Sequence, residues 1–170
     1  GSTPKEHAAA RLQSPRAKEL FDTWAKLAAD TFKGLTTDGN VQQGLFSLEP
    51  ANAPTEPMVV AAGQLLAMMP ADMRARVTFP LTSNAWQLWQ NTEILVDDHG
   101  LRLDQTSHEI RTGVLRVLAA SLSAKGFETT RGVMKLNQFL GDLVGGPAVL
   151  GEWAYTFVLF GKPSLDNPWG

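Results

Sequence analysis

The chain has 170 residues, of which 44% are hydrophobic and 19% are charged. This length and composition are typical of one globular domain with a substantial core, and they exclude a disordered, collagen-like or coiled-coil protein. Fifteen basic and seventeen acidic residues give a net charge of −2, and the basic residues are scattered, so we expect no nucleic-acid partner.

The chain contains no cysteine, which excludes disulfides, thiolate nucleophiles and thiolate metal ligands. Cysteine-free chains occur in the cytoplasm as well as outside it, and between these we favour an exported or periplasmic location. Apolar runs fall short of the roughly 18 residues that a membrane span needs, because Arg111, Arg116 and Lys125 interrupt the best candidates. We therefore expect no membrane partner either.

The chain opens with residues 1–13, which hold few large apolar side chains and predict a flexible arm. A single domain is expected over residues 14–170. Its first helix begins at Ser14 and Pro15, which are typical N-cap and first-turn residues, and apolar side chains follow at helical spacing to about Gly34.

The middle of the chain predicts short elements separated by turns. Asp38-Gly39 indicates a turn, either in a short hairpin or in an extended loop. The apolar stretch 58–69 predicts a helix deep in the core, and a shorter helix follows over residues 70–76. Residues 93–103 contain two apolar runs around a polar turn and predict a second hairpin.

Two long helices are expected in the second half. Thr106 and Glu109 have the spacing of a capping box at the start of the first. The second is predicted from Gly126 to Val144, where Gly145 ends it. The residues that we expect to face inward from this second helix are Val133, Leu136, Leu140 and Leu143.

The last strong signal is WAYTFVLF, residues 153–160, which predicts a β-strand bounded by Gly161 and Pro163. Both of its faces are largely apolar, so it belongs inside a sheet where each backbone group needs a partner. The upstream strand candidates are short and satisfy one edge only. We therefore expect a second polypeptide or a second copy of the chain to pair with residues 153–160.

These elements predict an α+β fold. Several amphipathic helices pack on a small, mainly antiparallel sheet that is incomplete in this chain.

Several stretches of the chain carry a family resemblance. They are GLFSL, MPADMRARVTFP, LSAKGFETTRGVMKLNQFLGDLVGG and EWAYTFVLFGKPSLDNPWG, and together they cover most of residues 35–170. On these the chain resembles the bacterial family catalogued as domain of unknown function 3500, which has no assigned activity. In that family the chain continues past Pro-Trp-Gly with a strand that includes Gly-His-His. The resemblance implies that residues 14–170 are the N-terminal part of a larger domain.

Candidate ligand-binding residues come from two places. Trp86 and Trp89 lie three residues apart and predict a surface for a sugar, an aromatic ligand or a peptide, with core packing as the alternative. Asn137 lies in the middle of a predicted helix, where an amide indicates either a ligand contact or a structural hydrogen bond.

A turn supplies the candidate metal ligands. Asp98 and His99, together with Asp97, offer carboxylate and imidazole groups that suit a divalent cation, and a solvated turn is the alternative. The cofactor is otherwise unknown.

Candidate catalytic residues stand at the entrance to the final strand. The resemblance implies that Glu152 and Tyr155 lead into the histidine-bearing hairpin, and a carboxylate near histidines suits metal binding or proton transfer. A surface carboxylate is the alternative. The chain has no P-loop, dinucleotide-binding, nucleophile-elbow or zinc-protease motif.

Two functions remain open at this point. One is a metal-assisted hydrolase or lyase whose site is completed by residues beyond this chain. The other is a non-catalytic binding or assembly module that uses an open strand edge and the region of Trp86 and Trp89. A chain with no activity of its own is a third alternative.

Overall fold

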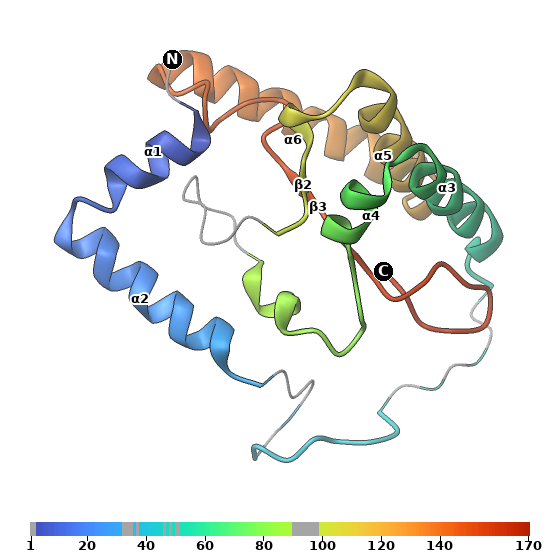
Figure 1. Ribbon diagram of the computed structural model, residues 1–170. Helices are drawn as coiled ribbons and strands as arrows, with labels where there is room; N and C mark the ends of the chain where they lie inside the picture. Colours follow the sequence, from blue (N-terminus) through green and yellow to red (C-terminus); the bar gives the residue numbers. More distant parts are fainter. Residues whose placement is uncertain are drawn as a thin grey trace.

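The computed structural model describes residues 3–31, 36, 38–45, 47, 49, 52–89 and 99–170. Figure 1 shows α1 (Pro4–Arg11) and α2 (Pro15–Ala29) along one side of the molecule and the other α-helices across from them. The remaining elements are α3 (Thr55–Met68), α4 (Ala71–Val77), β1 (Thr78–Phe79), η1 (Asn84–Leu88), β2 (Leu101–Arg102), η2 (Leu103–Gln105), α5 (His108–Ser121), α6 (Ala124–Val144), β3 (Thr156–Phe157) and β4 (Leu159–Phe160).

The N-terminal segment forms a helix, α1, within the predicted arm of residues 1–13, and the flexibility of that arm stays a prediction. The Thr3 hydroxyl accepts a hydrogen bond from the Glu6 amide, and the Glu6 carboxylate accepts one from the Thr3 amide at 2.7 Å. This capping box satisfies two amides that the helix leaves without partners, and Pro4 suits the first helical position. The start of α2 at Pro15, after Ser14, is confirmed.

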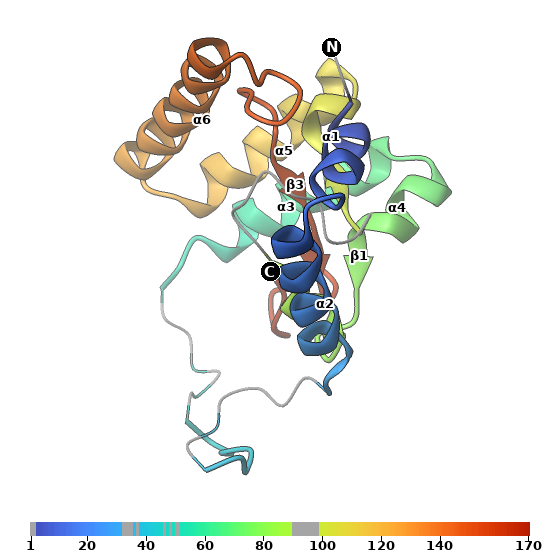
Figure 2. The same cartoon turned by 90° about the vertical axis from the view of Figure 1, so that its left-hand side faces the viewer.

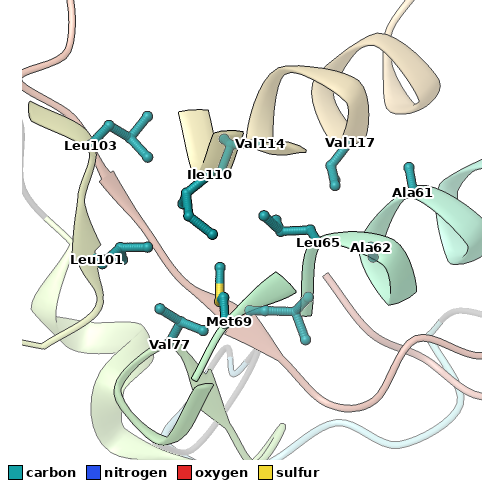
Figure 3. Packing of buried hydrophobic residues seen from close by; sticks show 11 residues of the cluster. Ala61, Ala62, Leu65, Met69, Val77, Leu101, Leu103, Ile110, Val114 and Val117 are labelled. Carbon is teal, nitrogen blue, oxygen red and sulfur yellow. The ribbon is translucent and has the colours of Figure 1, made fainter. Parts of the chain in front are cut away.

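The core lies mainly between α3 and α5, with α4 and the short strands closing it (Figure 3). The helices approach closely because Gly113 has no side chain: a Cβ there would lie 2.7 Å from Leu65 Cδ1. The buried residues of this cluster are Ala61, Ala62, Leu65, Met69, Val77, Leu101, Leu103, Ile110, Val114, Val117 and Leu159.

Two local predictions in the middle of the chain have different outcomes in the structure. Asp38 and Gly39 form the expected turn, since Gly39 has φ +87° and an isolated antiparallel bridge joins Thr36 to Val41. The stretch 58–69 is mostly helical, but the helix buries only one face, and the expectation that it lies wholly inside the core is wrong.

The start of α5 is displaced by one residue from the prediction. Ser107, rather than Thr106, is the N-cap, and its hydroxyl accepts a hydrogen bond from the Ile110 amide. The hydroxyl of Thr106 is already engaged, because it donates to the Leu103 carbonyl at 2.8 Å. Residues 93–98 of the second predicted hairpin lie outside the described residues.

The α+β class is confirmed, although helices dominate the described residues. β2 pairs with β3 in antiparallel orientation, and β1 pairs with β4 in parallel orientation. The strands therefore form two separate pairs, one parallel and one antiparallel, rather than one mainly antiparallel sheet.

The predicted strand 153–160 is shorter than expected, because its first residues form a turn and only β3 and β4 are extended. Phe160 exchanges two backbone hydrogen bonds with Gly170, at 2.6 and 2.9 Å. On the opposite edge, the Gly161 amide donates to the Phe79 carbonyl at 2.8 Å. The expectation of an open edge is therefore wrong at this end of the segment.

The long helix α6 forms as predicted, with Ser123 as N-cap and Gly145 in the left-handed conformation at its C-terminus. Its orientation is not as predicted. The four residues expected to face inward are at least 43% exposed, whereas Met134 and Gly141 are buried. The reason is that the chain following α6 folds back onto the stripe of Met134 and Gly141. None of the helices in the described part of the chain has the length and apolarity to cross a membrane.

Candidate functional site

The buried side of α6 is covered by the chain that follows it. The Gly146 amide donates to the Gly141 carbonyl at 2.9 Å, so the backbone reverses directly after the helix. The backbone of Leu150 then lies against Gly141, where a Cβ would overlap the Leu150 carbonyl oxygen. Glycine is therefore the residue that fits at this position.

Two amide side chains of α6 hold this returning segment. Asn137 Nδ2 donates to the Gly151 carbonyl at 2.9 Å, and Gln138 Oε1 accepts from the Glu152 amide at 3.2 Å. Both groups thus satisfy backbone atoms of a loop that has no regular structure, as buried polar groups require. A ligand contact by Asn137 stays a prediction, and the observed bond is the structural alternative.

Glu152 pairs with an arginine of α6. Its carboxylate accepts a hydrogen bond from Arg131 at 2.6 Å, and the two side chains are 27% and 23% exposed. The Arg131 guanidinium also lies 5.0 Å from the centroid of the Trp153 ring, while that of Arg111 on α5 lies 5.3 Å from the same ring. This cluster joins α5, α6 and the final segment through cation–π and ionic contacts.

Tyr155 lies close to this cluster along the chain, and its carbonyl accepts from the Leu103 amide at 2.8 Å. Partial burial raises the pKa of the Tyr155 phenol above its usual 10.0. The phenol is therefore protonated at neutral pH and cannot act there as a base. A catalytic role for Glu152 or Tyr155 stays a prediction.

The two tryptophans differ in their contacts and exposure. Trp86 stacks on Phe160 with ring centroids 3.6 Å apart and an interplanar angle of 14°, and its Nε1 donates to the Leu81 carbonyl at 2.7 Å. Trp89 follows the last residue of η1 and is 78% exposed. Trp86 packs on Phe160 but is itself 39% exposed, and Trp89 is the more accessible of the two. A ligand-binding role for either residue stays a prediction.

The predicted metal ligands are only partly visible. His99 lies edge-on to Phe79, with 6.3 Å between the ring centroids. Asp97 and Asp98 lie outside the described residues. Within the described ranges, no three His, Cys, Asp or Glu side chains are grouped as metal ligands.

One side of α6 presents an accessible apolar surface, which we call the α6 face. Its members are 43–70% exposed, although all are large and apolar. They are Val133, Leu136, Phe139, Leu140, Leu143 and Val144. Figure 2 shows α6 at the outer edge of the molecule, beside α5. Contiguous apolar side chains in such a position are typical of an interaction surface.

A family model described as "Protein of unknown function (DUF3500)" matches residues 51–170, which is more than half of the chain. The chain belongs to the DUF3500 family. Comparisons with curated proteins and with solved structures find no match. Membership therefore confirms the resemblance seen in the sequence and assigns no activity.

Within this DUF3500 chain, the sequence analysis names Glu152 and Asn137, which the structure brings to one loop, but misses Arg111, Arg131 and the α6 face. Arg131 has a signal in the sequence, since it lies three residues before Met134 and ten before Gly141 on one helical stripe. On the sequence alone, the apolar stripe of α6 is the stronger candidate for the buried face of the helix.

Proposed function

We propose that this DUF3500 chain is a non-catalytic binding and assembly module, and that the α6 face is its contact surface. The observation that carries the proposal is the orientation of α6. The helix turns its polar and small residues toward the returning loop and presents six large apolar side chains to solvent. An amphipathic helix whose apolar face is accessible suits recognition by a complementary helix or groove.

The polar groups near Glu152 support a catalytic function less strongly than the α6 face supports a binding function. The Glu152 carboxylate contacts Arg131, the Asn137 amide contacts the loop backbone, and the Tyr155 phenol is protonated at neutral pH. These contacts give each residue a role in holding the structure, which accounts for its presence without catalysis. The alternative of a metal-assisted hydrolase or lyase, completed by residues outside this chain, stays a prediction.

The strand edge is a weaker candidate for partner binding than the α6 face. At Phe160 both edges are occupied, by Gly170 and by β1. Pairing with a second polypeptide at residues 153–160 is thereby restricted to β3 and its immediate neighbours.

The proposal is tested with the double variant Leu136→Ser/Leu143→Ser. Because both side chains are exposed, we expect the melting temperature to stay within about 3 °C of the parent, a change of roughly 1 kcal/mol. Binding of the apolar dye anilinonaphthalene sulfonate should fall, since the accessible apolar surface is smaller. Circular dichroism and dye fluorescence measure the two effects.

The matched control is Val114→Ser on α5, where the side chain is 2% exposed. Loss of this buried side chain should destabilise the fold by about 2–4 kcal/mol. If the double variant melts as early as Val114→Ser, the α6 face is internal packing in solution and the proposed function is wrong.

A further inference from the structure

We infer that the occupant of the α6 face is the α6 face of a second copy of the chain, packed antiparallel about a twofold axis. This inference rests on the proposed function and names its partner. Three features support it: the spacing of the apolar side chains, the charges beside them, and the position of α6 in the molecule.

The apolar spacing is the same when read in either direction. Val133, Leu136, Leu140 and Leu143 are separated by three, four and three residues. When two such helices run antiparallel, Val133 of one copy lies opposite Leu143 of the other, and Leu136 opposite Leu140. Every apolar residue of the stripe then meets another, as a self-complementary twofold interface requires.

The charges follow the same centre. Lys135, Phe139 and Asp142 are spaced four and three residues apart, so they form one row along the edge of the α6 face. The same edges of two antiparallel helices face each other, which places Lys135 near Asp142 of the second copy, twice. A parallel pair would instead set this edge against the opposite edge of the partner helix, so that Lys135 and Asp142 of the two copies would not meet.

These two side chains have capacity for the contact. No described residue forms a salt bridge with Lys135. Asp142 accepts one hydrogen bond, from Gln138 Nε2 at 2.8 Å, and a carboxylate has room for more. Within one chain the two groups are seven residues apart, so a second copy is the natural source of each partner.

The position of α6 leaves its apolar side open to another molecule. Figures 1 and 2 both show the helix along the periphery, and its inner side is the one covered by the returning loop. A second copy therefore reaches the α6 face without displacing any described element.

The absence of cysteine allows a direct test of orientation by disulfide cross-linking. The variants Leu136→Cys and Leu140→Cys, one carrying a mass tag, are mixed in equal amounts and oxidised. Antiparallel pairing brings these two positions together, so the mixed disulfide should form several times faster than either homodimer. Mass spectrometry separates the three products. The control Lys162→Cys, on an exposed position outside α6, should form no cross-link with Leu136→Cys above background.

Sedimentation over a concentration series measures the assembly itself. We expect a monomer–dimer equilibrium for the parent chain and a monomer for Leu136→Ser/Leu143→Ser. Faster homodimer than mixed disulfide would overturn the antiparallel arrangement. A parent chain that stays monomeric would overturn the second copy as occupant and leave the α6 face to a different protein. Only unfolding of the double variant would remove the proposed function as well.

Discussion

Trp153 is the residue through which α5 and α6 meet the final segment of the chain. Its ring lies near the guanidinium groups of Arg111 and Arg131, each of which also has a polar partner. Arg111 is held by the Leu103 carbonyl at 2.7 Å and the Asp104 carbonyl at 3.0 Å, which keep its guanidinium over the ring. Contacts of this kind contribute about 0.5–1 kcal/mol each at exposed sites and more when desolvated.

Tyr155 allows a pH-dependent prediction because it is the only tyrosine in the chain. Burial raises the pKa of its phenol, so the folded state holds the proton more tightly than the unfolded state. Absorbance near the tyrosinate band should therefore titrate above 10.0 in the folded protein and return toward 10.0 in denaturant.

The sign of the stability change follows from the same shift. Below pH 10 both states are protonated, so the contribution of this group to stability is fully present and does not change with pH. As pH rises from 10.0 through the folded pKa, the unfolded state loses its proton first, so the contribution to stability is lost over that window. Tyr155→Phe should remove this alkaline component. A native titration at or below 10.0 would contradict the burial of the phenol.

At this scale the sequence identifies unusual residues but not their partners. An amide in mid-helix marks Asn137, and a carboxylate at a strand entrance marks Glu152, because both are unexpected where they lie. Their partners are 14 and 21 residues away, on the loop and on α6. Such contacts depend on how the chain returns after α6, which local spacing does not specify.

At the scale of elements, α6 shows why periodicity alone does not orient a helix. The stripe of Arg131, Met134, Gln138 and Gly141 has the same three-four-three spacing as the apolar stripe. Hydrophobicity favours burying the apolar stripe, but the close approach of Leu150 at Gly141 requires the other stripe to face the loop. Helix bounds and caps are predictable from local chemistry, whereas the buried face depends on tertiary contacts.

Gly141→Ala tests this account. The added methyl group would overlap the Leu150 carbonyl, a backbone atom that cannot rotate away, so we expect a loss of about 1–3 kcal/mol in the free energy of unfolding. The matched control is Gly132→Ala on the same helix, where nothing lies within 4 Å of the new Cβ. Alanine favours helix there and should raise stability by up to about 1 kcal/mol.

Denaturant unfolding of both variants measures the difference. Equal stabilisation by the two substitutions would show that the returning loop does not pack on Gly141 in solution. The same measurement would then weaken the orientation of α6 on which the proposed function depends.

The final segment illustrates the limits of strand prediction. Residues 153–160 have strong β propensity, yet each strand within them is two residues long, because β1 and β2 are equally short. Gly100, with φ +77°, brings the backbone before β2 close to Thr156 and Val158, where a Cβ would lie 2.7 and 2.6 Å from their side chains. Propensity describes how a strand fits its neighbours, and here the neighbours set the length.

At the scale of the whole molecule, the core and the family match coincide. All buried members of the core cluster lie between Ala61 and Leu159, inside the matched residues 51–170. The N-terminal helices contribute little to it: α2 has no buried residue, and one contact to the rest of the chain is the hydrogen bond from Gln87 Nε2 to the Asp30 carbonyl at 2.7 Å.

A chain that begins at Asn52 should therefore fold on its own. Because none of the residues removed belongs to the core cluster, we expect one cooperative transition with a melting temperature only a few degrees below that of the full chain.

The matched deletion removes residues 150–170. These include Leu159 and Phe160, which are 1% and 4% exposed, and the strand partners of β1 and β2. That deletion should abolish cooperative unfolding, since it opens the core from one side. Calorimetry of the two shortened chains decides the matter: an unfolded 52–170 chain would mean that α1 and α2 stabilise the core through contacts larger than their exposed surfaces indicate.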